Sequence, residues 1–285
     1  MTDKSLHALY GLKYNPFVAN LPPEAWWIPA PLEGFLGRVE ALVGQGGFAL
    51  VTGEPGLGKS KCLQLLAARL AGLADLSVGV MERPQSRLAD FYRELGELFG
   101  VSLTPLNRYG GFKALRARWR AHCEATLFRP VLLIDEAQEV SSECLTELRL
   151  LQSARFDSES LLFTVLSGDL RLTERFRSPE LLPLGSRIRT RLVLAALAAP
   201  ELGDYLAFAL REAGAPQLLT EQLAQTLCAH AAGNLRILTQ TAAELLAVAA
   251  GRNLSAPLDE QLYFEVFPPP SRSRRSRTAA APGGP

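Results

Sequence analysis

Apolar and polar residues recur with two different periods along the first two thirds of this chain. Short apolar runs, the pattern of strands buried on both faces, lie at residues 48–52, 131–134 and 161–166, and residues 76–81, which alternate apolar and small residues, read as another strand. Segments with apolar residues at helical spacing lie at 59–70, 86–99, 112–127 and 142–154. A further helix is expected to begin at residues 37–42, and residues 187–194 read as a β-like segment. This alternation predicts an α/β fold in which helices cover both faces of a parallel sheet.

From residue 199 onward the pattern is helical only. Amphipathic helices are expected at 200–213, 220–232 and 235–250, each with a glycine near its end, and a shorter helix at 259–267. The last residues are rich in Ser, Arg, Ala, Gly and Pro and are expected to be disordered. The chain therefore divides into an irregular N-terminal arm (1–30), a core (31–198), a helical domain (199–267) and a basic tail (268–285).

One turn of the core has the sequence Gly53-Glu54-Pro55-Gly56-Leu57-Gly58-Lys59-Ser60, which fits the phosphate-binding spacing G-x-x-x-x-G-K-[ST]. Its glycines let the backbone wrap closely enough for N–H groups to cradle phosphate oxygens. Lys59 is then placed to reach the β- and γ-phosphates of ATP, and the Ser60 hydroxyl to coordinate Mg²⁺. A glycine-rich turn without a ligand is disfavoured by the buried strand before it and the amphipathic helix after it. The aromatic pair Trp26-Trp27 is expected to pack the arm onto the domain or, alternatively, to border the nucleotide base.

Two acids follow the apolar run at 131–134, about 75 residues after the glycine-rich turn. Asp135 is suited to hold Mg²⁺ through water, and Glu136 to orient or deprotonate the attacking water. In an open α/β sheet the ligand lies outside the carboxyl ends of the strands, which is where both motifs are predicted. The alternative, that the two acids only cap a strand, does not explain why both motifs occur in the order of a triphosphatase.

Further polar residues are candidates for the same site. Ser167 ends the next predicted strand, where its hydroxyl could reach the γ-phosphate or the attacking water. Arg187, Arg189 and Arg191 alternate, and one of them could act in trans on a neighbouring subunit's γ-phosphate. Arg236 follows Gly233-Asn234 at the start of a helix and could swing onto the same phosphate. Each arginine taken alone could equally be a surface residue.

The composition of the chain argues against several classes of protein and site. The chain has 285 residues with 48% hydrophobic and 21% charged residues and a net charge of +1, which is ordinary for a soluble globular protein. No apolar stretch of about 18 residues and no signal peptide are evident, so a cytoplasmic protein without a membrane span is expected. The cysteines are far apart and the histidines form no cluster, which predicts reduced thiols and no zinc site.

With these residues assembled, the chain resembles the AAA+ ATPases over roughly residues 10–265. The matching features are Gly37-Arg38, the motif at 53–60, Asp135-Glu136, Ser167, an arginine near 187 and Gly233-Asn234-Leu235-Arg236. The resemblance implies a P-loop AAA+ core, its parallel sheet sandwiched by helices, followed by a small all-α lid domain. It also implies that Ser167 is the first sensor, Arg187 the arginine finger, and Arg236 the second sensor. Arg189 or Arg191 could be the finger instead.

Three short motifs look most like one branch of that superfamily: Tyr10-Gly11-Leu12, Asn15-Pro16-Phe17 and Ile134-Asp135-Glu136-Ala137-Gln138. The branch joins the ExeA-type ATPases of the general secretion pathway to transposition regulators of the TniB, TnsC and MuB type. Members of the transposition group bind DNA in an ATP-dependent way, oligomerise on it and recruit or activate a transposase. Secretion-type members add a membrane span and a peptidoglycan-binding domain, and neither is expected in these 285 residues.

The resemblance therefore predicts an ATP-hydrolysing, oligomeric regulator of transposition that binds double-stranded DNA, itself and a transposase or targeting protein. Its candidate DNA contacts are Arg83, Arg87, Arg108 and Lys113, although a basic helix is also typical of a solvated surface. The arginine-rich tail could add attraction to DNA or only solubility. One alternative is a cytoplasmic ExeA-like ATPase that assembles a secretion or envelope complex without DNA. Another is a scaffold that binds ATP but scarcely hydrolyses it.

Overall fold

A five-stranded parallel sheet forms the centre of the larger unit of the chain. The computed structural model describes residues 3–84, 87–103 and 107–268. The strands lie in the order β2-β3-β6-β1-β7, and each neighbouring pair is parallel. Their bounds are β1 Gly47–Gly53, β2 Val78–Met81, β3 Val131–Ile134, β6 Phe163–Gly168 and β7 Ile188–Leu194. The predicted α/β class is therefore confirmed.

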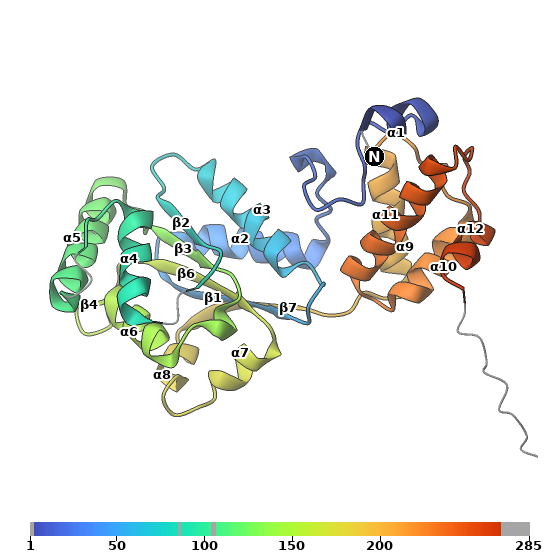
Figure 1. The fold of residues 1–285 in the computed structure, drawn as a ribbon. Helices are drawn as coiled ribbons and strands as arrows, with labels where there is room; N and C mark the ends of the chain where they lie inside the picture. The colour runs from blue at the N-terminus through green and yellow to red at the C-terminus, as the bar shows by residue number, and fades with distance from the viewer. Residues whose placement is uncertain (1–2, 85–86, 104–106, 269–285) are drawn as a thin grey trace, which may run out of the picture. The chain divides into compact units, whose positions relative to one another are not determined.

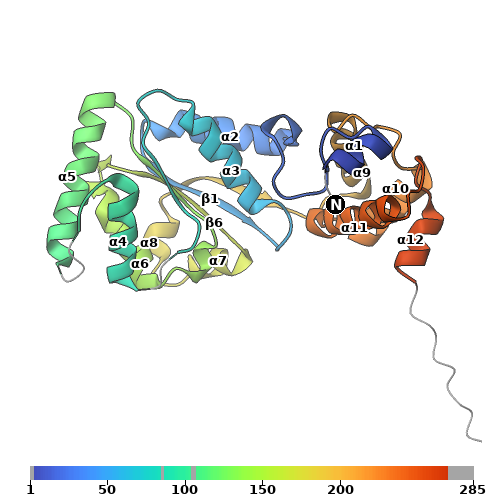
Figure 2. The same ribbon diagram turned by 45° about the horizontal axis from the view of Figure 1, so that its top comes forward.

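Helices cover both faces of this sheet (Figures 1 and 2). One face carries α2 (Ala30–Val43) and α3 (Lys59–Ala71). The opposite layer comprises α4 (Leu88–Phe99), α5 (Arg108–Thr126), α6 (Ser142–Gln152), α7 (Leu170–Arg175) and α8 (Leu182–Gly185). All four residues of β3 are buried, as expected for a strand covered on both sides. Its Leu132 and Ile134 belong to the same hydrophobic cluster as Phe91 of α4 and Trp119 of α5.

The remaining helices form a second compact unit, described here by itself. It contains α9 (Ala199–Glu212), α10 (Glu221–Ala231), most of α11 (Leu235–Gly251) and α12 (Glu260–Val266). Residues up to Trp26 group with these helices, and the Lys13 amide donates a hydrogen bond to the Ala213 carbonyl at 2.9 Å. The arm was predicted to be irregular, which is wrong for Asp3–Tyr10, because this segment forms helix α1. Its Leu6 side chain is buried, so the arm contributes to the core of the helical unit.

Several boundaries in the larger unit differ from the predicted ones. Helix α2 begins at Ala30 instead of residue 37, with Pro31 in its first turn, where the missing N–H has no cost. Helix α5 begins at Arg108 instead of 112, because the Asn107 side chain accepts a hydrogen bond from Gly110 N and caps the helix. Strand β6 extends through Ser167 to Gly168. The predicted disorder of residues 269–285 and the start of the helix at 86 lie outside the described residues.

The predicted helix at 142–154 ends at Gln152 and gives way to a short hairpin. Strands β4 (Ser153–Ala154) and β5 (Glu159–Ser160) pair antiparallel. Arg155, Phe156 and Asp157 in the connecting turn all have positive φ, at 47°, 56° and 67°. None of the three is a glycine, so the sequence does not indicate a turn here. The helix was therefore predicted two residues too long.

All four cysteines lie among the described residues, and none forms a disulfide. Each is buried, and burial raises the pKa of each thiol, that of Cys62 to about 12 with a contribution from the charge of Asp135. These thiols are therefore protonated at neutral pH, as expected of small buried hydrophobes. Within the described residues, no helix combines the length and the apolar character needed to cross a bilayer.

Candidate nucleotide-binding site

The glycine-rich turn joins the carboxyl end of β1 to the amino end of α3. Gly56 and Gly58 have φ of +88° and +98°, a left-handed conformation that side chains disfavour. Gly58 is the N-cap of α3, and this cap has no side-chain hydrogen bond. The amino end of a helix with such a turn presents backbone N–H groups and a positive partial charge, which suits phosphate.

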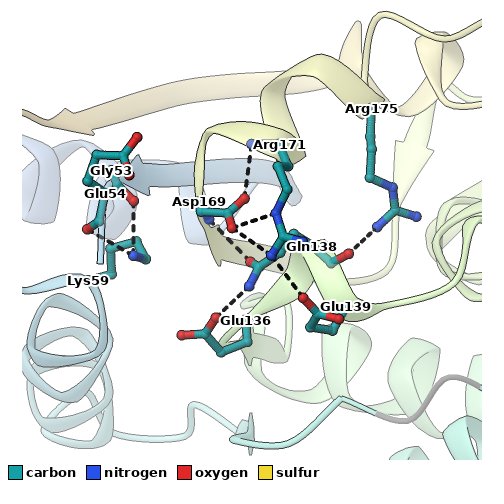
Figure 3. Close-up of polar contacts among 9 residues, drawn as sticks. All are labelled: Gly53, Glu54, Lys59, Glu136, Gln138, Glu139, Asp169, Arg171 and Arg175. Atoms are coloured by element: carbon teal, nitrogen blue, oxygen red, sulfur yellow. Dashed lines mark hydrogen bonds and ion pairs between the residues drawn. The ribbon is translucent and has the colours of Figure 1, made fainter. Parts of the chain in front are cut away.

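Lys59 is packed into this turn. The residue is only 7% exposed. Its Nζ donates to the Gly53 carbonyl at 2.9 Å and to the Glu54 carbonyl at 3.2 Å. Figure 3 shows the ammonium held between the two carbonyls. An ammonium has three donors, so one remains for a phosphate oxygen while the other two keep the turn closed.

The predicted acidic pair and Ser167 meet at the same edge of the sheet. The register places Ile134 beside Leu166 and Val51 beside Ser167, so all three strands end together. The Ser167 hydroxyl donates to Asp135 Oδ1 at 3.1 Å, and the Glu136 amide donates to the same oxygen at 2.9 Å. Both donors contact the same oxygen, Oδ1. Mg²⁺ binds proteins through one or two oxygen ligands plus substrate phosphates, so the Asp135 carboxylate and the Ser60 hydroxyl fit that ion.

Glu136 takes an unusual backbone conformation at this edge. Its φ of 47° and ψ of 40° lie in the left-handed region, which costs free energy for a residue other than glycine. The turn carries its carboxylate into an exposed position, where it accepts a hydrogen bond from Gln138 Nε2. Glu136 and Lys59 both lie at the carboxyl ends of the strands in Figure 3. This arrangement suits a carboxylate that acts on a water molecule rather than one that stabilises the fold.

The segment that contains Arg236, the predicted second sensor, contacts the glycine-rich turn. By their contacts, residues Asn234–Arg236 group with the larger unit. Asn234 Nδ2 donates to the Pro55 carbonyl at 2.9 Å, and the Arg236 amide donates to the Gly56 carbonyl at 3.1 Å. The contact of Asn234 was not predicted, and only its place beside Gly233 and Arg236 in the sequence could have suggested it.

Arg187 lies near the amino ends of the strands, at the end of the sheet opposite the glycine-rich turn. It precedes Ile188, which pairs with Phe48, five residues before Gly53. Five residues of extended chain span about 17 Å, so Arg187 is remote from the glycine-rich turn of its own chain. Its guanidinium forms an ion pair with Asp157 and donates to the Pro183 carbonyl. Hydrogen bonds from Ser153 and then Arg187 lower the pKa of Asp157 below its ordinary value, so this pair is charged at neutral pH.

The two other candidate fingers also have partners on their own chain. Arg189 donates to the Gly46 carbonyl at 3.1 Å and to Gln45 Oε1 at 2.6 Å. Arg191 donates to the Gly185 carbonyl at 3.2 Å. Arg187 and Arg189 line a polar hollow of about 290 Å³ beside the β4–β5 hairpin. Arg187 and Arg189 thus lie near the amino ends of the strands, whereas Asp135 and Glu136 follow the carboxyl end of β3.

The four candidate DNA contacts have different environments. Arg83 and Arg87 follow the carboxyl end of β2 and are exposed. Lys113 of α5 is exposed, with its Nζ 4.4 Å from the ring centroid of Tyr109. Arg108 forms an ion pair with Glu147, a carboxylate whose side chain is only 4% exposed. Loss of Arg108 would leave a buried charge without its cation, so this arginine has a structural task whatever else it contacts.

Other arginines of α5 are also bound to the chain itself. Arg116 donates to the Leu150 and Leu151 carbonyls at the end of α6, at 3.0 and 2.9 Å. Arg118 donates to the Phe99 carbonyl at the end of α4, at 3.3 Å. Arginine at a helix C-terminus satisfies carbonyls that have no intrahelical partner. Much of the basic character of this helix therefore serves the fold.

Comparisons with known proteins agree with this geometry. Residues 43–176 match the family described as "AAA domain". General secretion pathway protein A of Aeromonas hydrophila is 30% identical over 223 residues, which is 76% of this chain and 40% of that protein. The chain thus spans well under half the length of this relative.

Solved structures of lower identity share the fold. The ORC2 protein of Aeropyrum pernix, in ADPNP and ADP complexes, gives a TM-score of 0.66 at 18% identity, covering 90% of this chain and 71% of its own. The Aeropyrum pernix ORC1 protein in complex with DNA gives 0.59 at 19% identity, covering 87% and 65%. The chain is therefore similar to the AAA domain over residues 43–176 and to general secretion pathway protein A over 223 residues, and it has the P-loop AAA+ fold of the ORC structures.

Proposed function

We propose that the carboxyl edge of the sheet binds and hydrolyses ATP. The observation that carries this proposal is the convergence of Lys59, Asp135 and Glu136, with Ser167 bonded to Asp135. Backbone N–H groups and Lys59 bind the phosphates, and Glu136 orients the attacking water and takes up its proton. Mg²⁺, held by Ser60 and Asp135, would supply neutralising charge to the β- and γ-phosphates.

We further propose that a second copy of the chain completes this site. Arg187 is too far from its own glycine-rich turn to serve it, because it lies near the opposite ends of the strands. A head-to-tail arrangement would bring Arg187 of one copy to the glycine-rich turn, Asp135 and Glu136 of the next. Arg187 would then stabilise the charge that develops on the γ-phosphate, and it would exchange Asp157 for that phosphate.

This assembly predicts complementation between two inactive variants. Arg187→Ala should lower ATP turnover by about 10³-fold, since arginine fingers contribute on that scale. Its nucleotide affinity should stay near that of the wild type. Mixing it with Lys59→Ala, which keeps its arginine, should restore part of the turnover, because some interfaces then combine an intact turn with an intact Arg187. Turnover is measured by phosphate release at several mixing ratios.

Arg189→Ala and Arg191→Ala are the matched controls for this experiment. Full activity of Arg187→Ala, together with loss of activity in one of the controls, would assign the finger role to that other arginine. If Arg187→Ala is inactive but mixing restores nothing at any ratio, the proposal that the residue acts in trans is wrong.

Two downstream roles follow from the proposed ATPase. The first is regulation of DNA transposition, in which the ATP state controls assembly on double-stranded DNA and engagement of a transposase. It is supported by the branch resemblance and by the exposed cations Arg83, Arg87 and Lys113. The second is assembly of a secretion complex without DNA, which the 30% identity to general secretion pathway protein A favours.

Turnover and sedimentation, each with and without duplex DNA and in ATP or ADP, separate these roles. A transposition regulator should sediment with DNA only in ATP, with turnover stimulated by DNA and binding that weakens steeply as salt rises. Turnover that is indifferent to DNA, with no cosedimentation, would support the secretion role and reject the first. Binding of ATP without measurable turnover under any of these conditions would contradict the ATPase itself.

A further inference from the structure

The turn after Glu136 is tied to the end of β6 and to α7 by a set of polar contacts (Figure 3). Arg175 Nη1 donates to the Gln138 carbonyl at 2.7 Å. Arg171 Nη2 bridges Asp169, at 2.8 Å, and Glu139, at 3.0 Å. These contacts hold the short helix at Ala137–Glu139 against the amino end of α7.

Gln138 is the central member of this set. Its Oε1 accepts a hydrogen bond from the Asp169 amide at 3.2 Å, and its Nε2 donates to the Glu136 carboxylate. The Asp169 amide is a donor and the Glu136 carboxylate is an acceptor. These two partners determine which way the side-chain amide of Gln138 is oriented. The Gln138 side chain therefore spans from the acid proposed to be catalytic to the backbone at the end of β6.

Close approach of the backbone makes this span possible. A Cβ on Gly168 would lie 2.6 Å from Gln138 Oε1 and 2.9 Å from Leu172 Cδ2, which is closer than real contacts allow. Gly168 stands between Ser167, which bonds to Asp135, and Asp169, which bonds to Gln138. Ser167 and Asp169, on either side of Gly168, thus anchor the two acids, Asp135 directly and Glu136 through Gln138.

We propose that Gln138 is a positioning residue for ATP hydrolysis, which fixes the Glu136 carboxylate relative to the end of β6. Glu136 is exposed and its side chain has several rotatable bonds, so without a partner its carboxylate samples many orientations. The bond from Gln138 occupies one carboxylate oxygen and leaves the other for water. This inference rests on the proposed ATPase function.

The test is Gln138→Met, which keeps the length of the side chain and removes both hydrogen bonds. The turnover number should fall about tenfold, equivalent to about 1.4 kcal/mol of transition-state stabilisation. The KM for ATP, the affinity for nucleotide and the midpoint of thermal unfolding should not change. The matched control is Gln225→Met, because Gln225 Nε2 also donates to a glutamate, Glu221, at 3.1 Å, but in the helical unit.

Two further variants separate positioning from a structural role. In a Glu136→Gln background, Gln138→Met should not lower the single-turnover rate further, since the residue acts only through Glu136. Gly168→Ala should reproduce the tenfold loss, because its Cβ displaces the Gln138 amide. Full turnover of Gln138→Met, an equal loss in the Glu136→Gln background, or a lowered unfolding midpoint or nucleotide affinity would each overturn the inference.

These outcomes are distinguishable from failure of the proposed function. A wild-type protein without turnover, or a Glu136→Gln variant with full turnover, contradicts the ATPase assignment. A wild type that hydrolyses ATP, a Glu136→Gln variant that does not, and a fully active Gln138→Met variant contradict only the role of Gln138.

Discussion

Replacing Glu136 with glutamine is expected to lower ATP turnover by about 10²–10⁴-fold, the usual contribution of a general base. Glutamine has the same size and keeps a carbonyl oxygen, but it cannot take up a proton from water. The backbone at this residue should be unaffected, since the left-handed conformation is set by the turn and by the contacts of Ala137–Glu139. Nucleotide affinity, measured by titration with a fluorescent ATP analogue, should stay within about threefold of the wild type.

The matched control for Glu136→Gln is Glu143→Gln, the same change at an exposed carboxylate in the first turn of α6. Its turnover should equal that of the wild type. Unchanged turnover in Glu136→Gln would remove this residue from the mechanism. Loss of nucleotide binding together with turnover would show instead that the carboxylate supports the binding site.

Lys59→Ala should weaken nucleotide binding strongly and abolish turnover. The substitution removes the ammonium proposed to contact the phosphates and also the two hydrogen bonds that close the turn through Gly53 and Glu54. Hydrogen bonds of a charged group contribute about 1.5–3 kcal/mol each, so the affinity for ATP should fall by about 10²-fold or more. Because the lysine is largely buried, the measurement should include a thermal unfolding curve without nucleotide.

Lys13→Ala is the corresponding control, because Lys13 is exposed and its ammonium donates to the Glu212 carbonyl in the helical unit at 3.4 Å. It should bind ATP as the wild type does. Retained affinity in Lys59→Ala, with a normal unfolding midpoint, would show that the turn binds phosphate through its backbone alone. A lowered unfolding midpoint would show that Lys59 also stabilises the fold. The hydrogen bonds from its Nζ to the two turn carbonyls, at 2.9 and 3.2 Å, would explain that effect.

The candidate nucleotide site could be assembled from the sequence because its residues lie in short local motifs. The glycines and Lys59 lie within one turn, and Asp135-Glu136 directly follows a strand that is apolar at every position. Parallel strands bring their carboxyl ends to one edge, so the predicted strands were sufficient to place the acids near the turn. Ser167 was predicted for the same reason, although the observed bond to Asp135 depends on the register of β3 and β6.

Contacts between distant segments could not be predicted in this way. Arg108 was a candidate DNA contact, but no local pattern indicates that Glu147, on another helix, would be its partner. Gln138 follows Glu136 by two residues, yet its role depends on the backbone at Asp169, over thirty positions later. The β4–β5 hairpin was missed because its turn uses non-glycine residues with positive φ, whose conformation only tertiary packing specifies.

If Arg187 completes the site of a neighbouring copy, as proposed, its separation from the glycine-rich turn determines how turnover depends on the number of assembled copies. In such an assembly each copy offers Arg187 at one end of its strands and its site at the other, so all copies point the same way. A linear stack therefore has two chemically different ends. One terminal copy has an arginine without a site to complete, and the other has a site without an arginine. An open stack of n copies therefore contains n − 1 complete sites, whereas a closed one contains n. Turnover per copy then becomes a measure of stack length, rising toward a plateau as an open stack grows.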